Sequence, residues 1–316
     1  MARIILDMKI SIVTPTYNRA AYLDDTIRSV LTQRGDFDLE YVIQDGGSGE
    51  EVLRILDYWQ RRVNRGDFGS ECNGITFRYY IEEDNGMYDA INKGFERASG
   101  QIMAWINSDD MYHEYCFQSV CQVFERFPDI RWLIGMPNTY NHMGSKTGFH
   151  DFPGAYSQAF IQRGYYDPRF IDYGFHWIQQ ESTFWRRDLW HTAGPLNTQY
   201  KYAGDFHLWR EFAKHTDLVK LRSFLGGYRV HDNQITASPE HYMNELPEVE
   251  PPPLSLKLLR QFLTITPGVR NKYFSDKETG APLLDRLGLQ FNDLLGRTVE
   301  WSYPENKWIL KWNSIL

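Results

Sequence analysis

The sequence contains little cysteine and no long apolar stretch. Only three cysteines occur among its 316 residues, and none of them belongs to a CxxC pair. An odd number without such a pair argues against a disulfide framework and against a structural zinc site. No segment approaches the roughly 18 consecutive apolar residues of a membrane-spanning helix, and the amino terminus has no apolar stretch long enough for a signal peptide. We therefore expect free thiols and a cytoplasmic location.

The sequence also has no excess of basic over acidic residues. The chain has 34 Lys and Arg against 41 Asp and Glu, which gives a net charge of −7. Because non-specific binding to nucleic acid depends on a positive surface, we expect no nucleic-acid partner, although a single nucleotide could bind at a local site. With 42% hydrophobic and 16% aromatic residues, the composition excludes disorder, collagen and coiled coil, and it predicts a globular core.

Two common nucleotide-binding motifs are absent. The sequence at Gly47–Gly49 lacks the third glycine of the dinucleotide fingerprint, and no Walker A sequence occurs in the chain. Any nucleotide site must therefore be built from other residues.

The first third of the chain alternates β-rich runs with segments of helical periodicity. We expect strands at 9–15, 39–43, 75–81 and 102–106, and helices at about 22–31, 50–63, 88–98 and 115–127. This alternation predicts an α/β fold with a mostly parallel central sheet flanked by helices. Ligands of such sheets bind beyond the carboxyl ends of the strands. Polar clusters follow these ends at Thr14–Arg19, Asp45–Ser48, Glu82–Asp84 and Asn107–Asp110.

The rest of the chain is less regular. A helix is expected at 205–215, and strands are expected at 218–221 and 228–230. After residue 236 the composition shifts to a proline-rich linker and then to a remainder whose apolar spacing predicts a mainly helical extension. The apolar residues that would share one helix face are Leu283, Leu284, Leu287, Phe291, Leu294 and Leu295.

Several side chains at the strand ends have the chemistry of a metal or proton-transfer site. Asp109 and Asp110 directly follow a buried-looking strand, and hard divalent cations prefer such carboxylate oxygens. Asp205 begins an expected helix, and His231 ends an expected strand. Each of these residues also has an ordinary structural interpretation, as a helix cap, a turn residue or a structural histidine. None of them identifies a function by itself.

A series of fragments in fixed order resembles family 2 glycosyltransferases, which adopt the GT-A fold. The fragments similar to the donor half of that family are Thr14–Arg19, Asp45–Ser48, Glu83–Gly94 and Trp105–Asp110. Those similar to its acceptor half are Gln180–Asp188, Ala203–Trp209 and Tyr228–His231. The resemblance covers about 9–236. It implies a catalytic domain over 1–236, with its donor half at about 9–136 and its acceptor half at 137–236, followed by a linker and helical extension at 237–316.

Carried over residue by residue, the resemblance implies a donor site, a metal site and a catalytic base. Asp205 matches the aspartate that removes the proton from the acceptor hydroxyl. Asp109 and His231 match residues that reach a divalent cation, Mn²⁺ or Mg²⁺. The residues that match positions at the nucleotide and its diphosphate are Thr14, Tyr17, Arg19, Asp45, Asp84, Lys93, Asn107 and Ser108.

Two positions depart from the common family pattern. Asn107 stands where the Asp-x-Asp motif has its first aspartate, and Gly204 stands where a glutamate precedes the catalytic aspartate. Asn107 keeps hydrogen bonding without charge, and any support for Asp205 must come from elsewhere in the fold. On the acceptor side we place Glu181 and Trp177. Trp177 ends an aromatic segment whose rings either border a sugar site or pack in the core.

The resemblance thus implies an inverting, metal-assisted transfer of a sugar from a nucleotide sugar, UDP-linked by family frequency, to a hydroxyl group. The acceptor would be a glycan or a lipid-linked saccharide in bacterial-type surface polysaccharide or glycoconjugate assembly. A single base facing the acceptor, without a nucleophile on the donor face, favours inversion. Two alternatives stay open. One is a non-catalytic nucleotide-sugar or glycan-binding module. The other is a sugar nucleotidyltransferase, which the lack of a glycine-rich basic loop at Thr14–Arg19 disfavours.

The extension has two interpretations. A helix with apolar residues and few basic ones could lie on the inner face of a membrane, near lipid-linked acceptors. It could also pack on the catalytic domain or on a second copy in a homo-oligomer, which the scarcity of basic residues favours. The residues concerned are Leu254, Lys257, Leu258, Leu259, Arg260, Phe262 and Ile265.

Overall fold

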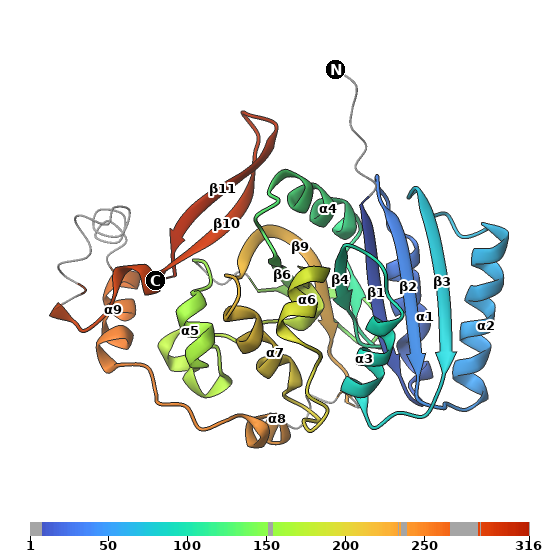
Figure 1. Ribbon diagram of the computed structural model, residues 1–316, viewed down its shortest axis with the longest axis horizontal. Helices are drawn as coiled ribbons and strands as arrows, with labels where there is room; N and C mark the ends of the chain where they lie inside the picture. The colour runs from blue at the N-terminus through green and yellow to red at the C-terminus, as the bar shows by residue number, and fades with distance from the viewer. Residues whose placement is uncertain are drawn as a thin grey trace.

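The computed structural model describes residues 8–150, 154–232, 234, 239–265, 284 and 286–315. A mixed sheet crosses the molecule, with helices packed against both faces (Figure 1). Its strands follow the order β11 (Lys307–Ser314), β10 (Leu295–Ser302), β9 (Val219–Arg229), β6 (Trp132–Tyr140), β8 (Thr183–Arg186), β4 (Ile102–Trp105), β1 (Lys9–Thr16), β2 (Asp38–Asp45) and β3 (Gly74–Ile81). Two short strands, β5 (Met111–Tyr112) and β7 (Lys146–Phe149), pair with β9 and β6. The expected α/β fold is confirmed.

The four strands expected in the first third of the chain form a parallel unit. Strand β1 pairs in parallel with β2 and β4, and β2 pairs in parallel with β3. Because side chains alternate between the faces of a strand, Ile12 and Val13 belong to different halves of the core. The helices on the Ile12 side are α1 (Ala20–Leu31), α2 (Glu50–Arg65) and α4 (Cys116–Arg126), and α3 (Met87–Glu96) lies on the Val13 side. The polar carboxyl ends of these strands therefore meet at one edge.

The middle of the chain completes the sheet with strands that the sequence pattern did not reveal. Strand β8 pairs antiparallel with β4 and β6, so the sheet is mixed here. One long strand, β9, replaces the two expected at 218–221 and 228–230. The register between β9 and β6 shifts at two points, so the side chains of β9 do not alternate regularly between the two faces of the sheet. A Cβ at Gly226 would lie 2.1 Å from the Glu181 carbonyl oxygen, so glycine allows β9 to approach the short 3-10 helix η2 (Gln180–Ser182).

The aromatic residues mostly fill the core on the α3 side of the sheet. The Trp105 and Trp209 rings stack with centroids 5.6 Å apart, and Trp185 packs edge-on against Trp105 at 5.5 Å. Helices α5 (Gln158–Arg163), α6 (Arg187–Ala193) and α7 (Gly204–Ala213), with the 3-10 helix η1 (Pro168–Tyr173), cover this side of the sheet. Core packing therefore accounts for the rings of the aromatic segment that are buried, which are Tyr165, Tyr166, Phe170 and Phe175.

In its described residues the extension begins with helices, as expected, but it ends in a hairpin, so the helix face expected to continue through Leu295 was wrong. Helices α8 (Pro239–Glu245) and α9 (Leu254–Ile265) are followed by the 3-10 helix η4 (Phe291–Leu294) and by the antiparallel hairpin β10–β11. Leu295 begins β10, whose threonine, valine and tryptophan side chains favour a strand. Strand β10 also pairs with β9, so the extension continues the central sheet. Leu283 and the expected boundary at residue 236 lie outside the described residues.

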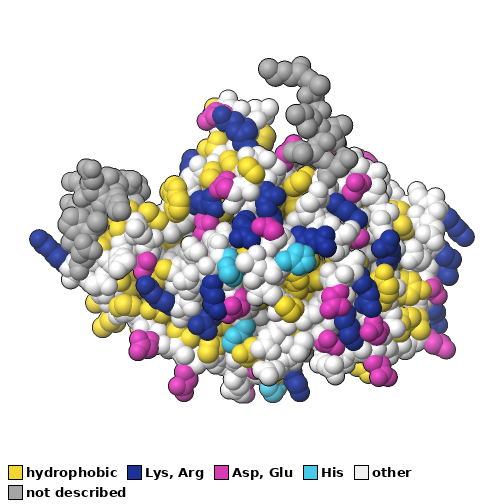
Figure 2. Space-filling view, viewed as in Figure 1, with side chains coloured by type: hydrophobic (Ala, Val, Ile, Leu, Met, Phe, Trp, Pro, Cys, Tyr) yellow, Lys and Arg dark blue, Asp and Glu magenta, His cyan; other side chains and the backbone are white. Residues whose placement is uncertain are grey.

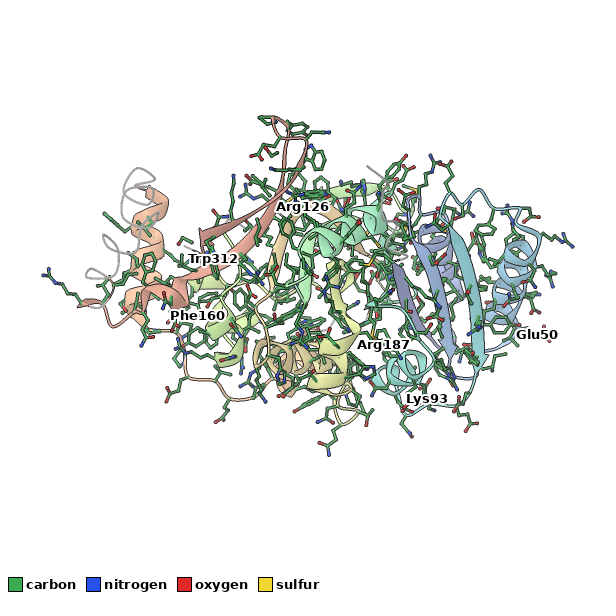
Figure 3. The ribbon with its side chains drawn as sticks, turned by 45° about the horizontal axis from the view of Figure 1, so that its top comes forward. Glu50, Lys93, Arg126, Phe160, Arg187 and Trp312 are labelled. Atoms are coloured by element: carbon green, nitrogen blue, oxygen red, sulfur yellow. The ribbon has the colours of Figure 1, made fainter. Side chains whose placement is uncertain are left out.

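The hairpin projects from the body, next to α4 (Figures 1 and 3). Arg126 of α4 donates from Nε to the carbonyl oxygen of Trp308 at 2.7 Å. The hairpin is therefore tied to α4 as well as to β9.

Helix α9 packs on the body through one face. Leu256, Leu259 and Leu263 are buried in the main core, so this face packs on the body of the molecule, as the second interpretation of the extension expected. Leu254, Leu258 and Phe262 are exposed, so the membrane contact stays a prediction. None of the helices in the described ranges combines the length and apolar character that a membrane crossing requires. Acidic and basic side chains are interspersed on the face drawn in Figure 2, and the three cysteines are free thiols.

Candidate active site

The loops that follow β1 and β2 are joined by hydrogen bonds. The backbone N–H of Asn18 donates to Ser48 Oγ at 2.7 Å, and the Gly49 N–H donates to Asn18 Oδ1 at 3.1 Å. Asn18 has a left-handed φ of 52°, a conformation that asparagine tolerates better than most residues. The structure thus brings together two of the polar clusters that the sequence placed at a donor site.

Asp45 is fully buried at the end of β2, where its carboxylate organises its own loop. It accepts hydrogen bonds from the backbone N–H groups of Gly47 at 3.1 Å and Ser48 at 2.8 Å, and from Ser48 Oγ at 2.5 Å. These bonds shape the turn before α2. Recognition of a base by Asp45 remains a prediction.

Gly46 allows two other predicted donor residues to approach this strand end. A Cβ at Gly46 would lie 2.5 Å from Asp84 Oδ2 and 3.3 Å from Tyr17 Cδ2. Burial raises the pKa of Asp84, although its Oδ1 accepts a hydrogen bond from the Gly86 N–H at 2.9 Å. Lys93, labelled on α3 in Figure 3, donates to the Glu83 carbonyl oxygen at 2.7 Å. Tyr17, Asp84 and Lys93 therefore border the same edge.

Thr14 and Thr16 occupy different depths in β1. Thr14 is fully buried, and its hydroxyl lies 3.0 Å from the Tyr41 hydroxyl in a hydrogen bond between β1 and β2. Thr16 ends the strand, and its buried Oγ1 has no hydrogen-bond partner among the described residues. Thr16 is thus the better placed of the two to meet a ligand, and the sequence did not single it out. Arg19 is exposed where α1 begins.

The two predicted metal ligands meet, although 122 positions separate them in the chain. Asp109 Oδ2 and His231 Nε2 are 3.1 Å apart, with Asp109 in the loop after β4 and His231 just beyond β9. Ser108 is buried beside Asp109. Asn107 donates from Nδ2 to Asp110 Oδ2 at 3.3 Å, while its buried Oδ1 has no hydrogen-bond partner in the part of the chain that the structure describes.

This arrangement fits a divalent cation that also binds a diphosphate. Within the described ranges, no group of three or more His, Cys, Asp or Glu side chains is arranged to hold a metal ion. Mg²⁺ and Mn²⁺ commonly take one or two protein ligands together with substrate phosphate oxygens. The Asp109–His231 pair supplies an oxygen and a nitrogen ligand, and the free Asn107 Oδ1 adds a neutral oxygen nearby.

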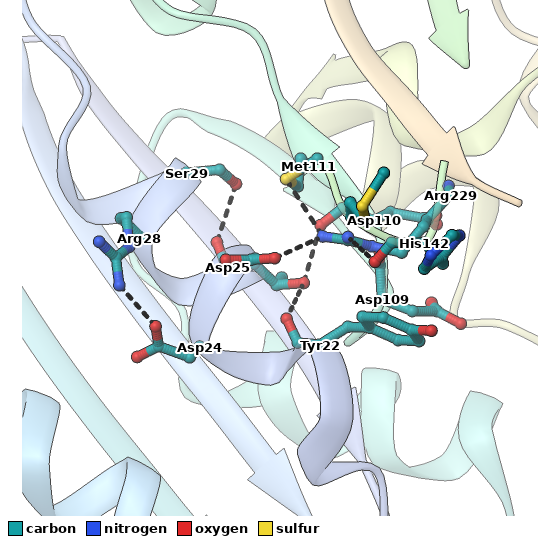
Figure 4. Close-up of polar contacts among 12 residues, drawn as sticks. Tyr22, Asp24, Asp25, Arg28, Ser29, Asp109, Asp110, Met111, His142 and Arg229 are labelled. Atoms are coloured by element: carbon teal, nitrogen blue, oxygen red, sulfur yellow. Dashed lines mark hydrogen bonds and ion pairs between the residues drawn. The ribbon is translucent and has the colours of Figure 1, made fainter. Parts of the chain in front are cut away.

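Arg229, the last residue of β9, fixes the loop that carries Asp109 (Figure 4). Its wholly buried side chain donates to the Asp109 carbonyl oxygen at 2.9 Å, to the His142 carbonyl oxygen at 3.1 Å and to Asp25 Oδ2 at 2.9 Å. Its backbone N–H donates to Asp110 Oδ1 at 3.0 Å. Arg229 thereby joins α1, the Asp109–Asp110 loop and β9.

The Tyr22 ring connects Arg229 to His231. The guanidinium of Arg229 lies 4.5 Å from the centroid of the Tyr22 ring, and the His231 ring centroid lies 4.6 Å from that of Tyr22. One aromatic ring therefore contacts both the buried cation and the imidazole of the proposed metal pair. The sequence fragment Tyr228–His231 contained this arginine without indicating its role.

We expect Arg229→Met to lower the free energy of unfolding by about 2–4 kcal/mol, because it removes several hydrogen bonds from a buried site. Urea denaturation measures the change. Arg28→Met is the matched control, since Arg28 and Asp24 form an exposed ion pair that should contribute less than about 1 kcal/mol. Equal losses in the two variants would contradict the role given to Arg229.

Asp205 and Glu181 form the second part of the site. Gln180 Nε2 donates to the Trp105 carbonyl oxygen at 2.5 Å, which anchors η2 at the end of β4. Burial and the nearby charge of Asp205 raise the pKa of Glu181 to about 7. Burial likewise raises the pKa of Asp205 to about 7, assisted by the charge of Glu245. Helix α7 has Ala203 at its N-cap, so capping does not account for Asp205.

A continuous set of acidic side chains joins the two parts. Burial, then the charges of Asp109 and Glu181, raise the pKa of Asp110 well above its usual range. Glu181 interacts in the same way with Asp205. The charges of Asp110 and Glu181 thus interact with the proposed metal pair on one side and with the proposed base on the other.

Gly204 has a steric reason to replace the glutamate of the family pattern. A Cβ at this position would lie 2.6 Å from Cε2 of Tyr88, whose hydroxyl donates to the Tyr202 carbonyl oxygen at 2.8 Å. The Tyr88 ring of α3 fills the space into which a larger side chain would extend. Support for Asp205 must come from other residues.

Trp177 and Glu181, both placed on the acceptor side, are linked through Gln179. With the Gln179 amide oriented to satisfy both neighbours, its nitrogen donates to Glu181 Oε1 at 3.3 Å, and its oxygen accepts from the Trp177 indole at 2.5 Å. The Trp177 side chain is 41% exposed, whereas Glu181 is 4% exposed. Trp177 therefore offers an exposed ring beside the buried carboxyl groups, as a sugar-binding surface requires.

We expect the raised pKa of Asp205 to make the protein less stable as pH rises. In the unfolded chain Asp205 ionises near its ordinary value of 3.8, whereas in the folded protein it keeps its proton up to about 7. The folded state therefore binds more protons between these values, and stability is lost as pH rises through this window. The Asp205→Asn variant has no ionisable side chain at this position, so it should not lose stability in this pH window for this reason.

Chemical denaturation at pH 5 and pH 8 tests this expectation. The free energy of unfolding of Asp205→Asn should exceed that of the wild type by about 2–4 kcal/mol at pH 8, with a smaller difference at pH 5. A variant that is less stable than the wild type at pH 8 would contradict the assigned pKa.

Comparison with known proteins identifies the family and the fold. The model of the family described as "Glycosyl transferase family 2" matches residues 11–187. An uncharacterized glycosyltransferase of Nostoc sp. is 30% identical over 118 residues, which are 37% of this chain and 33% of the relative. A PGL/p-HBAD biosynthesis glycosyltransferase of Mycobacterium bovis is 28% identical over 197 residues, 62% of this chain and 66% of the relative. The matches thus span less than two thirds of these relatives.

Two solved structures share the fold. TarS 1–349 of S. aureus, in complex with UDP-GlcNAc, has a TM-score of 0.55 and 15% identity, with 74% of this chain and 63% of that chain covered. The mannosyltransferase PcManGT from Pyrobaculum calidifontis, in complex with GDP-Man and Mn²⁺, has a TM-score of 0.51 and 14% identity, with 82% and 71% covered. At this identity the likeness establishes the fold alone, and it confirms the expected GT-A type.

Proposed function

Because the chain belongs to glycosyl transferase family 2, we propose that it transfers a sugar from a nucleotide sugar to an acceptor hydroxyl, with inversion and with Asp205 as the base. The observation that supports this proposal is the contact of Asp109 with His231, next to the buried carboxyl groups of Asp110 and Glu181, the second of which interacts electrostatically with Asp205. Such a transfer needs two parts. One is a metal-binding pair for the diphosphate, and the other is a carboxyl group of near-neutral pKa for the acceptor hydroxyl.

The donor would bind over the ends of β1 and β2, where Tyr17, Asp84 and Lys93 border the bonded loops. We take the donor to be a UDP-sugar. TarS was solved with UDP-GlcNAc and PcManGT with GDP-Man, so proteins of this fold accept either base.

Asp109 and His231 would hold a divalent cation, Mn²⁺ or Mg²⁺, with Asn107 Oδ1 nearby. When bound, such a cation neutralises the negative charge that develops on the diphosphate leaving group. Arg229 keeps the main chain of Asp109 in place for this contact.

Asp205 has the properties of a general base for the acceptor hydroxyl. A base is most effective when its pKa lies near the working pH, and the pKa of Asp205 is raised to about 7. Its buried Oδ1 has no hydrogen-bond partner among the described residues, so it can accept the hydroxyl proton. Glu181 is linked to Gln179 and is assigned to holding the site together, so we propose no nucleophile on the donor face and direct displacement with inversion.

The acceptor would bind beside Trp177, whose exposed ring can stack on a sugar. We propose a glycan or a lipid-linked saccharide of bacterial surface polysaccharide or glycoconjugate assembly, made on the cytoplasmic side. The relatives in Nostoc and Mycobacterium support a bacterial setting. The exposed Leu254, Leu258 and Phe262 of α9 would suit contact with a membrane that holds such an acceptor.

A screen of nucleotide sugars tests the proposal. Thermal unfolding of the protein is followed with UDP-, dTDP- and GDP-sugars, each with Mn²⁺ or with EDTA, and release of nucleoside diphosphate is then measured for the sugars that bind. We expect a metal-dependent rise in Tm with a UDP-sugar and slow metal-dependent hydrolysis. If no nucleotide sugar raises the Tm or is cleaved, the proposed function is wrong, and binding without cleavage would favour a non-catalytic module.

A further inference from the structure

Helix α8 of the extension packs against the beginning of α7, the helix that carries Asp205 (Figure 1). Leu246, just after α8, is buried together with Ala203 and Phe206, and Tyr242 packs against this cluster. The rings of His241 and Tyr202 stack with centroids 5.1 Å apart. A segment assigned by sequence to a separate extension therefore covers the base end of the catalytic site.

Glu245, the last residue of α8, binds three successive backbone amides. Its Oε2 accepts from the N–H groups of Lys201 at 3.0 Å, Tyr202 at 2.7 Å and Ala203 at 2.9 Å, and its Oε1 accepts from Lys201 at 2.9 Å. Burial opposes ionisation of Glu245, but these bonds hold its pKa below the ordinary value. A charged carboxylate thus fixes the main chain two residues before Asp205.

Tyr242, one helical turn earlier, faces the catalytic carboxyl group. Tyr242 packs against the cluster of Ala203, Phe206 and Leu246. Burial raises the pKa of both Asp205 and Tyr242, the Tyr242 hydroxyl lowers that of Asp205 in part, and the charge of Asp205 raises that of Tyr242 further. Asp205 Oδ1 has no hydrogen-bond partner within the described ranges. Tyr242 is therefore placed to act on the carboxyl group, one oxygen of which has no hydrogen-bond partner in the described part of the chain.

We propose that α8 is a positioning element of the active site, in which Glu245 fixes the main chain before Asp205 and Tyr242 orients its carboxyl group. The catalytic unit then extends beyond residue 236, and α8 supplies the support that Gly204 cannot give. This inference rests on the proposed role of Asp205 as the base.

Among the described residues, titratable side chains of three elements interact electrostatically with Asp205. Tyr88 comes from α3, Glu181 from η2, and Tyr242 and Glu245 from α8. The two substitutions in α8 should act in opposite directions on the titration of Asp205. Tyr242→Phe removes the hydroxyl that lowers the pKa of Asp205, whereas Glu245→Gln removes a neighbouring negative charge and keeps an oxygen for the backbone amides.

The titration of Asp205 is measured by ¹³C NMR on protein labelled at the aspartate carboxyl carbon, and the resonance that disappears in Asp205→Asn identifies it. We expect Tyr242→Phe to move the midpoint upward by about one pH unit, the size expected for loss of one hydrogen bond to a charged group. Glu245→Gln should move it downward. Tyr79→Phe removes a hydroxyl bonded to Asp57 on the surface, and Glu300→Gln removes a charge in the hairpin, so both controls should leave the midpoint unchanged.

Measurements of turnover distinguish a positioning role of α8 from a general loss of structure in the variants. Nucleoside diphosphate release from a UDP-sugar with Mn²⁺ should show the same opposite shifts in the acid limb of its pH profile. Glu245→Ala should lower kcat about tenfold with little change in KM for the donor, and Glu245→Gln should recover most of this loss. If Tyr242→Phe and Glu245→Gln both leave the Asp205 midpoint unchanged, or shift it in the same direction, the inference is wrong.

A wild-type protein that cleaves no nucleotide sugar would count against the proposed function alone. The carboxyl titration does not depend on turnover, so it would still decide whether α8 acts on Asp205.

Discussion

Asp205→Asn should lower kcat for sugar transfer by about 10²–10⁴-fold, the range in which a positioned general base contributes to catalysis. Asparagine keeps the shape of the side chain but cannot take the proton of the acceptor hydroxyl. Because Asp205 lies at the opposite end of the site from the Asp109–His231 pair, the affinity for the nucleotide sugar should change little. The measurement is release of nucleoside diphosphate at saturating donor, with donor affinity taken from calorimetry.

Asp188→Asn is the matched control, since Asp188 forms a surface ion pair with Arg131 at 2.9 Å and lies outside the site. It should retain the wild-type rate. The expected rise in stability of Asp205→Asn at pH 8 shows separately that loss of activity is not loss of folding. A normal transfer rate in Asp205→Asn would exclude Asp205 as the base.

Glu181→Gln distinguishes the two carboxyl groups whose pKa is raised to about 7. Glu181 is almost fully buried and linked to Gln179, so we assign it to holding the site together. Its substitution should reduce kcat less than that of Asp205. A variant Glu181→Gln without activity, beside an active Asp205→Asn, would transfer the role of base to Glu181.

The sequence predicted the parts of the fold and site that depend on local pattern. The parallel strands have apolar runs that end in polar clusters, and the geometry of such a sheet requires those clusters to meet. Asp109 and His231 could be paired because the fragments around them resembled one family in a fixed order. Their meeting at 3.1 Å follows from the adjacency of β9 and the loop after β4, which spacing along the chain alone does not contain.

The errors and omissions have a common cause, which is contact between distant segments. Leu294 and Leu295 have helical spacing to Leu287, but pairing with β9 and β11 places Leu295 in a strand. Glu245 and Tyr242 belong to a short helix with no motif of its own, and only its packing on α7 reveals their relation to Asp205. Arg229 was within a recognised fragment, yet its role depends on a carbonyl oxygen of Asp109.

Asp109→Ala should weaken metal-dependent binding of the nucleotide sugar by at least about 100-fold, because even changes in the outer shell of a metal site cost about 10–100-fold. The variant loses the carboxylate ligand and leaves His231 without its partner at 3.1 Å. Calorimetric titration with UDP in Mn²⁺ and in EDTA measures the effect. In Mn²⁺ the wild type should bind much more tightly than the variant.

The measurement in EDTA decides why binding is lost. If Asp109 acts through the cation, the wild type and Asp109→Ala should bind UDP with equal, weak affinity once the metal is removed. If the substitution instead disturbs the loop held by Arg229, the variant should remain weaker than the wild type in EDTA as well, and its unfolding free energy should fall. Unchanged affinity in Mn²⁺ would show that the cation, if any, is held elsewhere. Since Asn107 carries no charge, the Asp109 carboxylate is the sole anionic ligand of the proposed metal set, so its removal should have a larger effect than that of His231.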